Sequence, residues 1–412
     1  MKQAPQTTAI IGAGVSGLYT ARALHRRGVH VTVFDTVDVA GGASAGNAGW
    51  ITPSLAYPLT SPSMLRQGIR SVARPRSAIK VPAPQSWQTI SFLSQFARNS
   101  TKRRWQRGAD ALEHLNRRCL ETYSALAEEI GFSLHSGSYI AGFASELEYT
   151  AFMESLEYSL PQGSPITISE LDPDEVRARE PISDDLGYVA EVSGEAFIDP
   201  SAMCQALAAR LEETGVTIIR RTRILDLRTH GRRVELLTEM GKRHSFDAAV
   251  VANGAWLGDW RRRLGIRTAI QGGRGYSFLV PTPMPITRAI YFPTERIVCT
   301  PVMGKLRISA VMDVEHPGAR FNPKRIDTIV RTARRIMPGI DYSKREREWV
   351  GSRPCTGDGL PLIGESALAN VYIHGGHAMW GMTQAPVSAD HLAEHMVTGA
   401  ADPAMSPFDP LR

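Results

Sequence analysis

The chain has 412 residues, of which 43% are hydrophobic and 21% charged, and this composition is typical of a soluble globular protein long enough for two domains. No apolar run approaches the roughly 20 residues that a membrane-spanning helix needs. The first expected strand begins too near the N-terminus to leave room for a signal peptide, and the four cysteines lie far apart without a C-x-x-C motif. These features disfavour a membrane-spanning protein, a disulfide framework and a metal site, so we expect a cytoplasmic protein that holds no metal.

The net charge of +6 is distributed unevenly along the chain. No Asp or Glu occurs from Val39 to Ala109, whereas residues 66–107 are rich in Arg and Lys interleaved with aromatic side chains. A segment of this kind suits contact with an anionic membrane surface, and a solvated basic face is the plainer interpretation. Binding of nucleic acid is disfavoured because no nucleic-acid-binding motif accompanies the charge.

The first predicted elements lie in the stretch TTAIIGAGVSGLYTARALHRRGVHVTVFD, which runs from Thr7 to Asp35. A short apolar strand precedes a G-x-G-x-x-G turn, a helix from about Val15 to Arg27 and a second strand over 29–34. This order predicts a dinucleotide site rather than an ordinary glycine turn in a βαβ unit, although it does not distinguish FAD from NAD. The residues of the turn are Gly12, Gly14, Val15, Ser16 and Gly17.

Each part of this stretch has a predicted physical role. Gly12 makes the tight turn, Gly14 lets a pyrophosphate approach the backbone, and Gly17 lets the helix pack close to the strand. The pyrophosphate would lie at the helix N-terminus, where free N–H groups favour an anion. Asp35 ends the second strand, where an acidic side chain accepts hydrogen bonds from the ribose hydroxyls.

The rest of the chain alternates between nucleotide-type patterns and other patterns. In chain order we expect a glycine-rich loop (41–54), helices (86–130), a strand (137–144), a helix, strand and hairpin (202–241), a buried strand (248–252), a strand-rich region (272–314), a helix (322–337), a last strand (372–376) and a last helix (385–398).

Nucleotide-type patterns thus occur in three separated pieces. We therefore predict an α/β fold with a discontinuous dinucleotide-binding domain formed by residues 1–60, 196–262 and 350–412. Residues 61–195 and 263–349 would form a second domain, inserted twice into the first.

Four stretches carry a resemblance to a known family. They are the opening motif ending at Asp35, ASAGNAGWITP, FDAAVVANGAW, and GSRPCTGDGLPLIGES followed by VYIHGGHAMWGMTQAPVSADHLAEHMVTG. Together they resemble the flavin amine oxidoreductases related to D-amino-acid oxidase, and most of all the bacterial D-amino-acid dehydrogenases of small-subunit type. The resemblance implies a Rossmann-like FAD-binding domain of the glutathione-reductase type, with an inserted α+β substrate domain that contains a mostly antiparallel sheet.

The resemblance also implies which residues contact the FAD. The glycine-rich loop would follow the pyrophosphate, the ribityl chain and the ring edge, and the loop after the last strand would reach the flavin ring. The additional contact residues implied are Gly42, Ser44, Asn47, Ala48, Gly49, Ile224, Ala252, Gly254, Gly376, Gly381, Met382 and Thr383. We expect non-covalent FAD, because the attachment cysteine of sarcosine oxidase aligns near Gly351 and not with Cys355.

The implied reaction moves a hydride from the substrate Cα to flavin N5, after which water hydrolyses the imine to a 2-oxo acid and ammonia. No side-chain nucleophile is required, but a fixed cation must hold the substrate carboxylate, and Arg suits this role. Arg353 matches the family's carboxylate arginine, with a structural ion pair as the alternative. Tyr276 and Arg274 match a segment that lines the substrate cavity, and His377 follows the flavin-loop glycines, where a structural histidine is equally plausible. Tyr139 and Tyr291 are weaker candidates, with core tyrosines the plainer interpretation.

Several functions remain open at this stage. The leading one is oxidative deamination of D-amino acids, with oxygen or a membrane quinone as electron acceptor. The alternatives are oxidation of glycine, sarcosine or a cyclic imino acid, a nicotinamide dehydrogenase, and a non-catalytic flavin-binding scaffold. The sequence specifies neither the amino acid nor its stereochemistry. If residues 66–107 contact a membrane, the protein would lie peripherally on its inner face.

Overall fold

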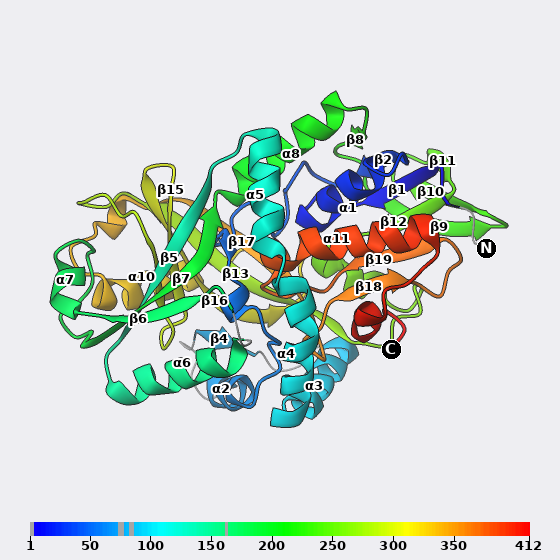
Figure 1. The fold of residues 1–412 in the computed structure, drawn as a ribbon. Coiled ribbons are helices and arrows are strands. Elements are labelled where there is room, and N and C mark those ends of the chain that lie inside the picture. The colour runs from blue at the N-terminus through cyan, green and yellow to red at the C-terminus, as the bar shows by residue number, and fades with distance from the viewer. Residues whose placement is uncertain (1–3, 73–77, 82–85, 161–163) are drawn as a thin grey trace.

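The computed structural model describes residues 4–72, 78–81, 86–160 and 164–412, which contain two large β-sheets flanked by helices (Figure 1). Arg74 and Arg76 of the basic segment lie outside these described residues. Within them, every helix is too short or too polar to cross a bilayer.

The first sheet has six strands in the order β18-β19-β12-β1-β2-β8. All neighbours run parallel except β18 and β19, and buried parallel strands of this kind are rich in aliphatic residues. The strands are β1 (Thr7–Ile11), β2 (His30–Phe34), β8 (Thr217–Ile219), β12 (Ala248–Val251), β18 (Leu362–Glu365) and β19 (Val371–Gly375). They come from three separated parts of the chain.

Both faces of this sheet are covered. One face packs against helices in a large apolar cluster, and these helices are α1 (Val15–His25), α4 (Lys102–Asn116), α5 (Cys119–Ile130), α8 (Pro200–Glu213) and α11 (Gly381–Thr398). The other face packs against a three-stranded antiparallel sheet and the short helix α9 (Leu257–Trp260). That small sheet contains β9 (Ile224–His230), β10 (Arg233–Thr238) and β11 (Arg243–Phe246).

The second large sheet has the strand order β17-β13-β16-β15-β14-β5-β7-β3, with β4 added beside β16 and β6 beside β7. Only the pairs β14–β5 and β16–β4 are parallel, so the predicted mostly antiparallel sheet is confirmed. The strands are β3 (Trp50–Ile51), β4 (Ile79–Lys80), β5 (Leu134–Phe143), β6 (Thr167–Leu171), β7 (Tyr188–Ile198), β13 (Ile270–Val280), β14 (Ala289–Phe292), β15 (Ile297–Val302), β16 (Lys305–Glu315) and β17 (Glu346–Thr356).

Helices also border this second sheet. Helix α10 (Pro323–Ile336) covers one face, and the other helices of this region are α2 (Pro62–Val72), α3 (Trp87–Asn99), α6 (Glu146–Ser159) and α7 (Pro173–Arg177). Strands β7 and β17 cross the predicted domain boundaries at 196 and 350. The division into two domains at those residues stays a prediction.

The last helix begins earlier than its sequence pattern suggested. We expected a start at Ala385, but α11 begins at Gly381 and contains Pro386 in its interior. Proline has no N–H to donate to the carbonyl four residues earlier, which belongs to Met382. The hydroxyl of Tyr123, on α5, donates to that carbonyl oxygen at 2.7 Å and so stabilises the longer helix.

Candidate cofactor and substrate site

A cavity of about 430 Å³ lies where β1, β2 and β12 end, beside the first turns of α1 and α11. Ligands of open parallel sheets bind outside the carboxyl ends of the strands, and the volume is within the usual range of about 300–1,000 Å³ for such sites. Most of the predicted contact residues line it, namely Gly12, Gly14, Val15, Ser16, Asp35, Gly42, Ser44, Asn47, Ile224, Ala252, Gly254, Arg353, His377, Gly381 and Met382.

The glycine turn has the geometry that its spacing predicts. Gly12 has a φ of +114°, and a Cβ atom there would collide with the carbonyl oxygen of Ala252. A Cβ atom at Gly17 would collide with the carbonyl oxygen of Gly12, so Gly17 serves helix–strand packing and does not line the cavity. The turn therefore has no side chain at these two positions, and its backbone stays accessible where β1 meets α1.

Asp35 already accepts two backbone hydrogen bonds. Its Oδ2 accepts from the N–H of Ala13 at 2.7 Å, and its Oδ1 accepts from the N–H of Val37 at 2.9 Å. Burial raises the pKa of Asp35, while these two donors lower it. A carboxylate has about four acceptor positions, so Asp35 is held in place and can still accept from hydroxyl groups of a ligand.

The loop after β2 is stabilised by its own side chains. The hydroxyl of Ser44 accepts from the N–H of Val15 at 3.0 Å and thus uses one donor of the α1 N-terminus. The amide of Asn47 donates to the carbonyl oxygens of Ala43 and Ser44, and its Oδ1 accepts from the N–H of Gly49 at 2.8 Å. These bonds fix the loop along the cavity wall.

Four other predicted contact residues serve the packing of the chain. Gly49 approaches the carbonyl oxygen of Ile198, and Gly376 approaches Thr356 and Leu362 too closely for a side chain. The carbonyl oxygen of Ala48 accepts from Thr300, and the hydroxyl of Thr383 accepts from the N–H of Thr52. The side chains lining the cavity do not include Ala48, Gly49, Gly376 or Thr383.

Arg353, on β17, carries a partly buried charge beside this cavity. Its guanidinium lies over Gly275 of β13, where no larger residue would fit, and its Nη1 donates to the carbonyl oxygen of Val311 at 3.3 Å. Among the residues that the structure describes, no carboxylate pairs with it. Burial lowers the pKa of Arg353, but a guanidinium stays protonated in proteins. The arrangement leaves a cation available to an anionic ligand.

The predicted roles of Tyr276 and Arg274 are not supported by where the structure places them. Side chains alternate along β13, and Tyr276 packs into the core beneath α10, with its ring beside Phe321. Arg274 pairs with Glu315 at 3.1 Å. Neither residue lines the cavity, because both lie on the opposite face of β13 from the glycine that contacts Arg353.

His377 lines the cavity and is part of a buried hydrogen-bonded chain. Its Nε2 lies 3.2 Å from the hydroxyl of Ser388, which lies 2.8 Å from Nε2 of His374. Nδ1 of His374 lies 2.7 Å from the hydroxyl of Thr20, on α1. Burial lowers the pKa of His377 well below its usual value, so its imidazole is neutral near pH 7. The chain links α1, β19 and α11 behind the cavity.

Cys355 is not among the residues that line the cofactor cavity. Its Sγ packs against Gly273 and lines a separate apolar cavity of about 240 Å³ between α2, α3 and the second sheet. Burial raises the pKa of this thiol to about 11. Tyr139 and Tyr291 also lie elsewhere, in an aromatic cluster with Trp50.

Some lining residues have no signal in the sequence that we recognised. They include Thr222 and Arg223 before β9, and Trp256 and Trp260 after β12. The two tryptophans follow the buried strand in NGAWLGDW, so the turn at Asn253 and Gly254 was the available signal for them. Ser352 and Pro354 line the cavity as neighbours of Arg353.

A family model described as FAD dependent oxidoreductase matches residues 7–395 of the chain. The chain belongs to this family. The predicted family and its cofactor class are thereby confirmed.

The FAD-dependent oxidoreductases that resemble the chain include two proteins named D-amino acid dehydrogenase. The one from Cereibacter sphaeroides (strain ATCC 17029 / ATH 2.4.9) is 27% identical, over 95% of this chain and 92% of the relative. The one from Vibrio atlanticus (strain LGP32) is 24% identical, over 95% of this chain and 96% of the relative.

Two solved structures show the same fold. Glycine oxidase from Geobacillus kaustophilus has a TM-score of 0.75 at 20% identity and covers 100% of this chain and 99% of that one. L-proline dehydrogenase from P. horikoshii has a TM-score of 0.75 at 18% identity and covers 100% of this chain and 98% of that one.

The residues of this family member fit FAD. The glycine turn leaves room for a pyrophosphate, two helices begin at the cavity, and Asp35 is fixed at the end of β2. In addition, the buried side-chain oxygen of Asn253, a lining residue, makes no hydrogen bond with any described residue. An unpaired buried polar atom is costly unless a ligand satisfies it.

Proposed function

We propose that the protein oxidatively deaminates amino acids with FAD, and that D-amino acids are its substrates. The observation that carries this proposal is the partly buried guanidinium of Arg353, which lacks a carboxylate partner among the described residues and lines the cofactor cavity. A substrate α-carboxylate would supply the missing anion, because the planar fork of Arg matches a carboxylate.

Bound FAD supplies the two-electron acceptor for the hydride of the substrate Cα, and water then converts the substrate imine into a 2-oxo acid and ammonia. The protein's own contribution is binding and orientation. Arg353 holds the carboxylate and fixes the direction of the substrate, while the neutral His377 contributes an uncharged cavity wall. The buried cavity limits access of water to the reacting atoms.

The assignment to D-amino acids is supported by the names of the two relatives that match nearly the whole chain. Glycine, sarcosine and cyclic imino acids are the second candidate substrates. These compounds also carry a carboxylate that Arg353 can bind. The carboxylate contact therefore does not distinguish them from D-amino acids, and a substrate test is needed.

The test is anaerobic reduction of the purified flavoprotein by a panel of D- and L-amino acids, glycine, sarcosine and hydroxyprolines. We expect the flavin absorbance near ~450 nm to bleach with D-amino acids. Bleaching by glycine, sarcosine or imino acids alone would replace the D-amino-acid assignment with the second candidate. No bleaching by any of them would favour the flavin-binding scaffold.

Non-covalent attachment of FAD and contact with a membrane surface are further parts of this proposal. The buried thiol of Cys355 lies outside the cofactor cavity and its pKa is raised, which supports non-covalent binding. Heat or acid denaturation should therefore release all of the FAD into the supernatant.

Rapid reoxidation by air after bleaching would identify oxygen as the acceptor, and slow reoxidation would favour a membrane quinone.

A further inference from the structure

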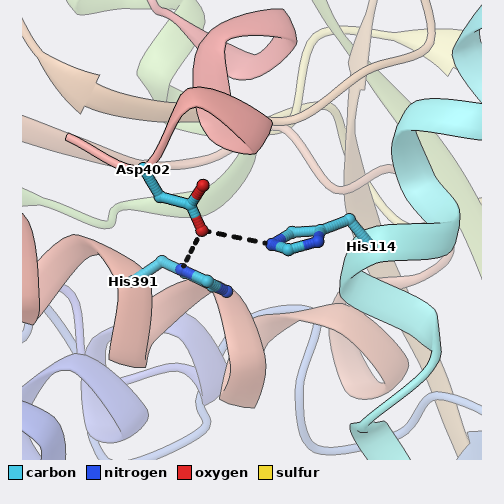
Figure 2. Close-up of side chains that lie close together, drawn as sticks. All are labelled: His114, His391 and Asp402. Atoms are coloured by element: carbon cyan, nitrogen blue, oxygen red, sulfur yellow. Dashed lines mark ion pairs between the residues drawn. The ribbon is translucent and has the colours of Figure 1, made fainter.

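Three potential metal ligands from distant parts of the chain converge on one point of the surface (Figure 2). His114 lies on α4 and His391 on α11, and Asp402 precedes the 3₁₀ turn at Pro403–Phe408. Nε2 of His114 lies 3.4 Å from Oδ2 of Asp402, and Nδ1 of His391 lies 3.3 Å from the same oxygen. The three ligand atoms all lie within 4.8 Å of one another.

These distances fit a tetrahedral metal. Zn²⁺ binds His nitrogen at about 2.0–2.1 Å and carboxylate oxygen at about 2.0–2.2 Å, so tetrahedral ligand atoms are separated by about 3.3–3.4 Å. The two measured separations have this length. Two imidazoles and one carboxylate also match the three-ligand sites in which solvent occupies the fourth position.

The side chains are positioned in a way that leaves these atoms available. Oδ1 of Asp402 accepts from the N–H of Ala404 at 2.9 Å, which orients the carboxylate and directs Oδ2 towards the two rings. Second-shell bonds of this kind commonly orient metal ligands. Nε2 of His114 is shielded from solvent and makes no hydrogen bond with any described residue.

The three side chains lie at the protein surface and are partly exposed. The exposed fractions of His114, His391 and Asp402 are 38%, 22% and 37%.

We propose that His114, His391 and Asp402 bind one divalent transition-metal ion, with Zn²⁺ the preferred ion. The metal would join α4, α11 and the segment that follows α11. Because the first turn of α11 lines the cofactor cavity, the site would stabilise a helix of the FAD-binding region. The metal takes no part in the proposed oxidation.

The experiment uses full-length flavoprotein without a histidine tag, freed of metal by a chelator and then dialysed. Co²⁺ is added as a spectroscopic probe and Zn²⁺ by calorimetric titration. We expect one ion per chain, visible Co²⁺ bands typical of tetrahedral coordination that Zn²⁺ abolishes, and a Zn²⁺-induced rise in Tm of about 2–5 °C. Mg²⁺ and Ca²⁺, which prefer sites built from oxygen ligands, should give no stabilisation.

The variants His114→Gln, His391→Gln and Asp402→Asn should each lose the Co²⁺ bands and the Zn²⁺-induced rise in Tm while retaining FAD. Asp402→Asn keeps an oxygen that can accept from Ala404, so it tests the charge without removing this cap. His395→Gln is the matched control, because His395 lies one turn further along α11 and pairs with Glu365 at 3.3 Å without a second histidine.

The proposal predicts that His395→Gln binds metal as the native protein does. It is overturned if the native protein binds neither Co²⁺ nor Zn²⁺, or if folded variants of the three residues bind as tightly as the control. Loss of metal binding with unchanged FAD reduction by amino acids would separate this site from the proposed activity.

Discussion

Arg353 and Arg274 lie on neighbouring strands, and their partners distinguish them. Arg274 is neutralised by Glu315, whereas the guanidinium of Arg353 donates to the backbone carbonyl oxygen of Val311. Arg353→Ala should lower kcat/KM for amino-acid reduction of the flavin by about 10²–10³-fold, because it removes a charge-assisted double hydrogen bond. The kcat/KM of Arg353→Lys should lie between those of Arg353→Ala and the native protein, since Lys keeps the charge and loses the planar fork of Arg.

Stopped-flow reduction at a series of substrate concentrations measures this effect, with bound FAD quantified by absorbance. Arg274→Lys is the matched control and should reduce at the native rate. Equal rates for Arg353→Ala and the native protein would refute the carboxylate role. A general loss of FAD from Arg353→Ala would instead indicate a structural role, and Arg353→Lys would then decide between the two.

Glu195, on β7, is a buried carboxyl group whose pKa is raised to about 8, mainly by burial. The folded protein therefore holds a proton that the unfolded chain releases above about pH 4.5. Stability contributed by this group is fully present below pH 4.5 and is lost as the pH rises through 8. Glu195→Gln should remove this loss and stabilise the protein by up to about 5 kcal/mol at pH 9, and by little at pH 4.5.

Urea unfolding at pH 4.5, 7 and 9 checks the difference between Glu195→Gln and the native protein. Glu191→Gln is a control on the same strand, where the carboxylate accepts from Ser138 and faces Arg288. It shows the effect of removing a carboxylate that has hydrogen-bond and charge partners. A constant difference between Glu195→Gln and the native protein at all three values would contradict the raised pKa.

The residues that line the site could be predicted from the sequence where a local motif fixes their position. The prediction was weaker where the face of a strand determines which side chains reach the site. Gly12, Gly14 and Asp35 line the cavity because the turn and the strand end place them there. Tyr276 does not line the cavity, and its sequence neighbours do not reveal which face of β13 meets the cofactor region. The β13–β16 pairing also shifts register between Arg274 and Tyr276, which a sequence pattern does not show.

Most helices and strands could be predicted because their apolar periodicity is strong. Their ends were predicted less well, because the ends depend on tertiary contacts. The start of α11 illustrates this, since a hydroxyl from α5 replaces the hydrogen bond that Pro386 removes. Tyr123→Phe should therefore destabilise the protein by about 1–3 kcal/mol through the unsatisfied carbonyl of Met382. It should also release FAD at a lower temperature, because Met382 lines the cavity.

Thermal unfolding and flavin fluorescence, followed together, test this prediction. Tyr342→Phe is a matched control, since the Tyr342 hydroxyl donates to the carbonyl oxygen of Met337 at 3.1 Å in the core beneath α10. The control should lose stability without early FAD release. If Tyr123→Phe is as stable as the native protein, the hydroxyl does not sustain the first turn of α11.

At the scale of the whole molecule, the separated nucleotide-type pieces were predictable because each one has its own strand–helix pattern. Strands from all three pieces lie in one six-stranded sheet, while the domain boundaries stay a prediction. The cluster of His114, His391 and Asp402 was not predictable, and the sequence had indicated no metal site, because ligands on three elements have no spacing rule. Long-range convergence is visible only in the folded chain.

The role of the basic segment, residues 66–107, also depends on where its helices lie in the whole molecule. Helices α2 and α3 lie at the lower edge of the molecule in the view of Figure 1. Residues of both helices line one apolar cavity. Ile69 and Trp87 are 65% and 76% exposed there, near the exposed Arg66 and Arg70. Exposed apolar side chains among cations suit an anionic lipid surface. We therefore predict that the protein cosediments with vesicles containing phosphatidylserine and less with neutral vesicles.

Salt should weaken this binding, because each cation near the surface contributes about 1 kcal/mol and is screened within a Debye length of about 10 Å at 0.1 M salt. The double variant Arg66→Glu and Arg70→Glu should lose most of it, and Trp87→Ser should weaken it at all salt concentrations. Met240→Ser is the control, since Met240 is 86% exposed in the turn between β10 and β11. Equal binding of all variants, or binding to neutral vesicles alone, would show that this face is a solvated basic surface.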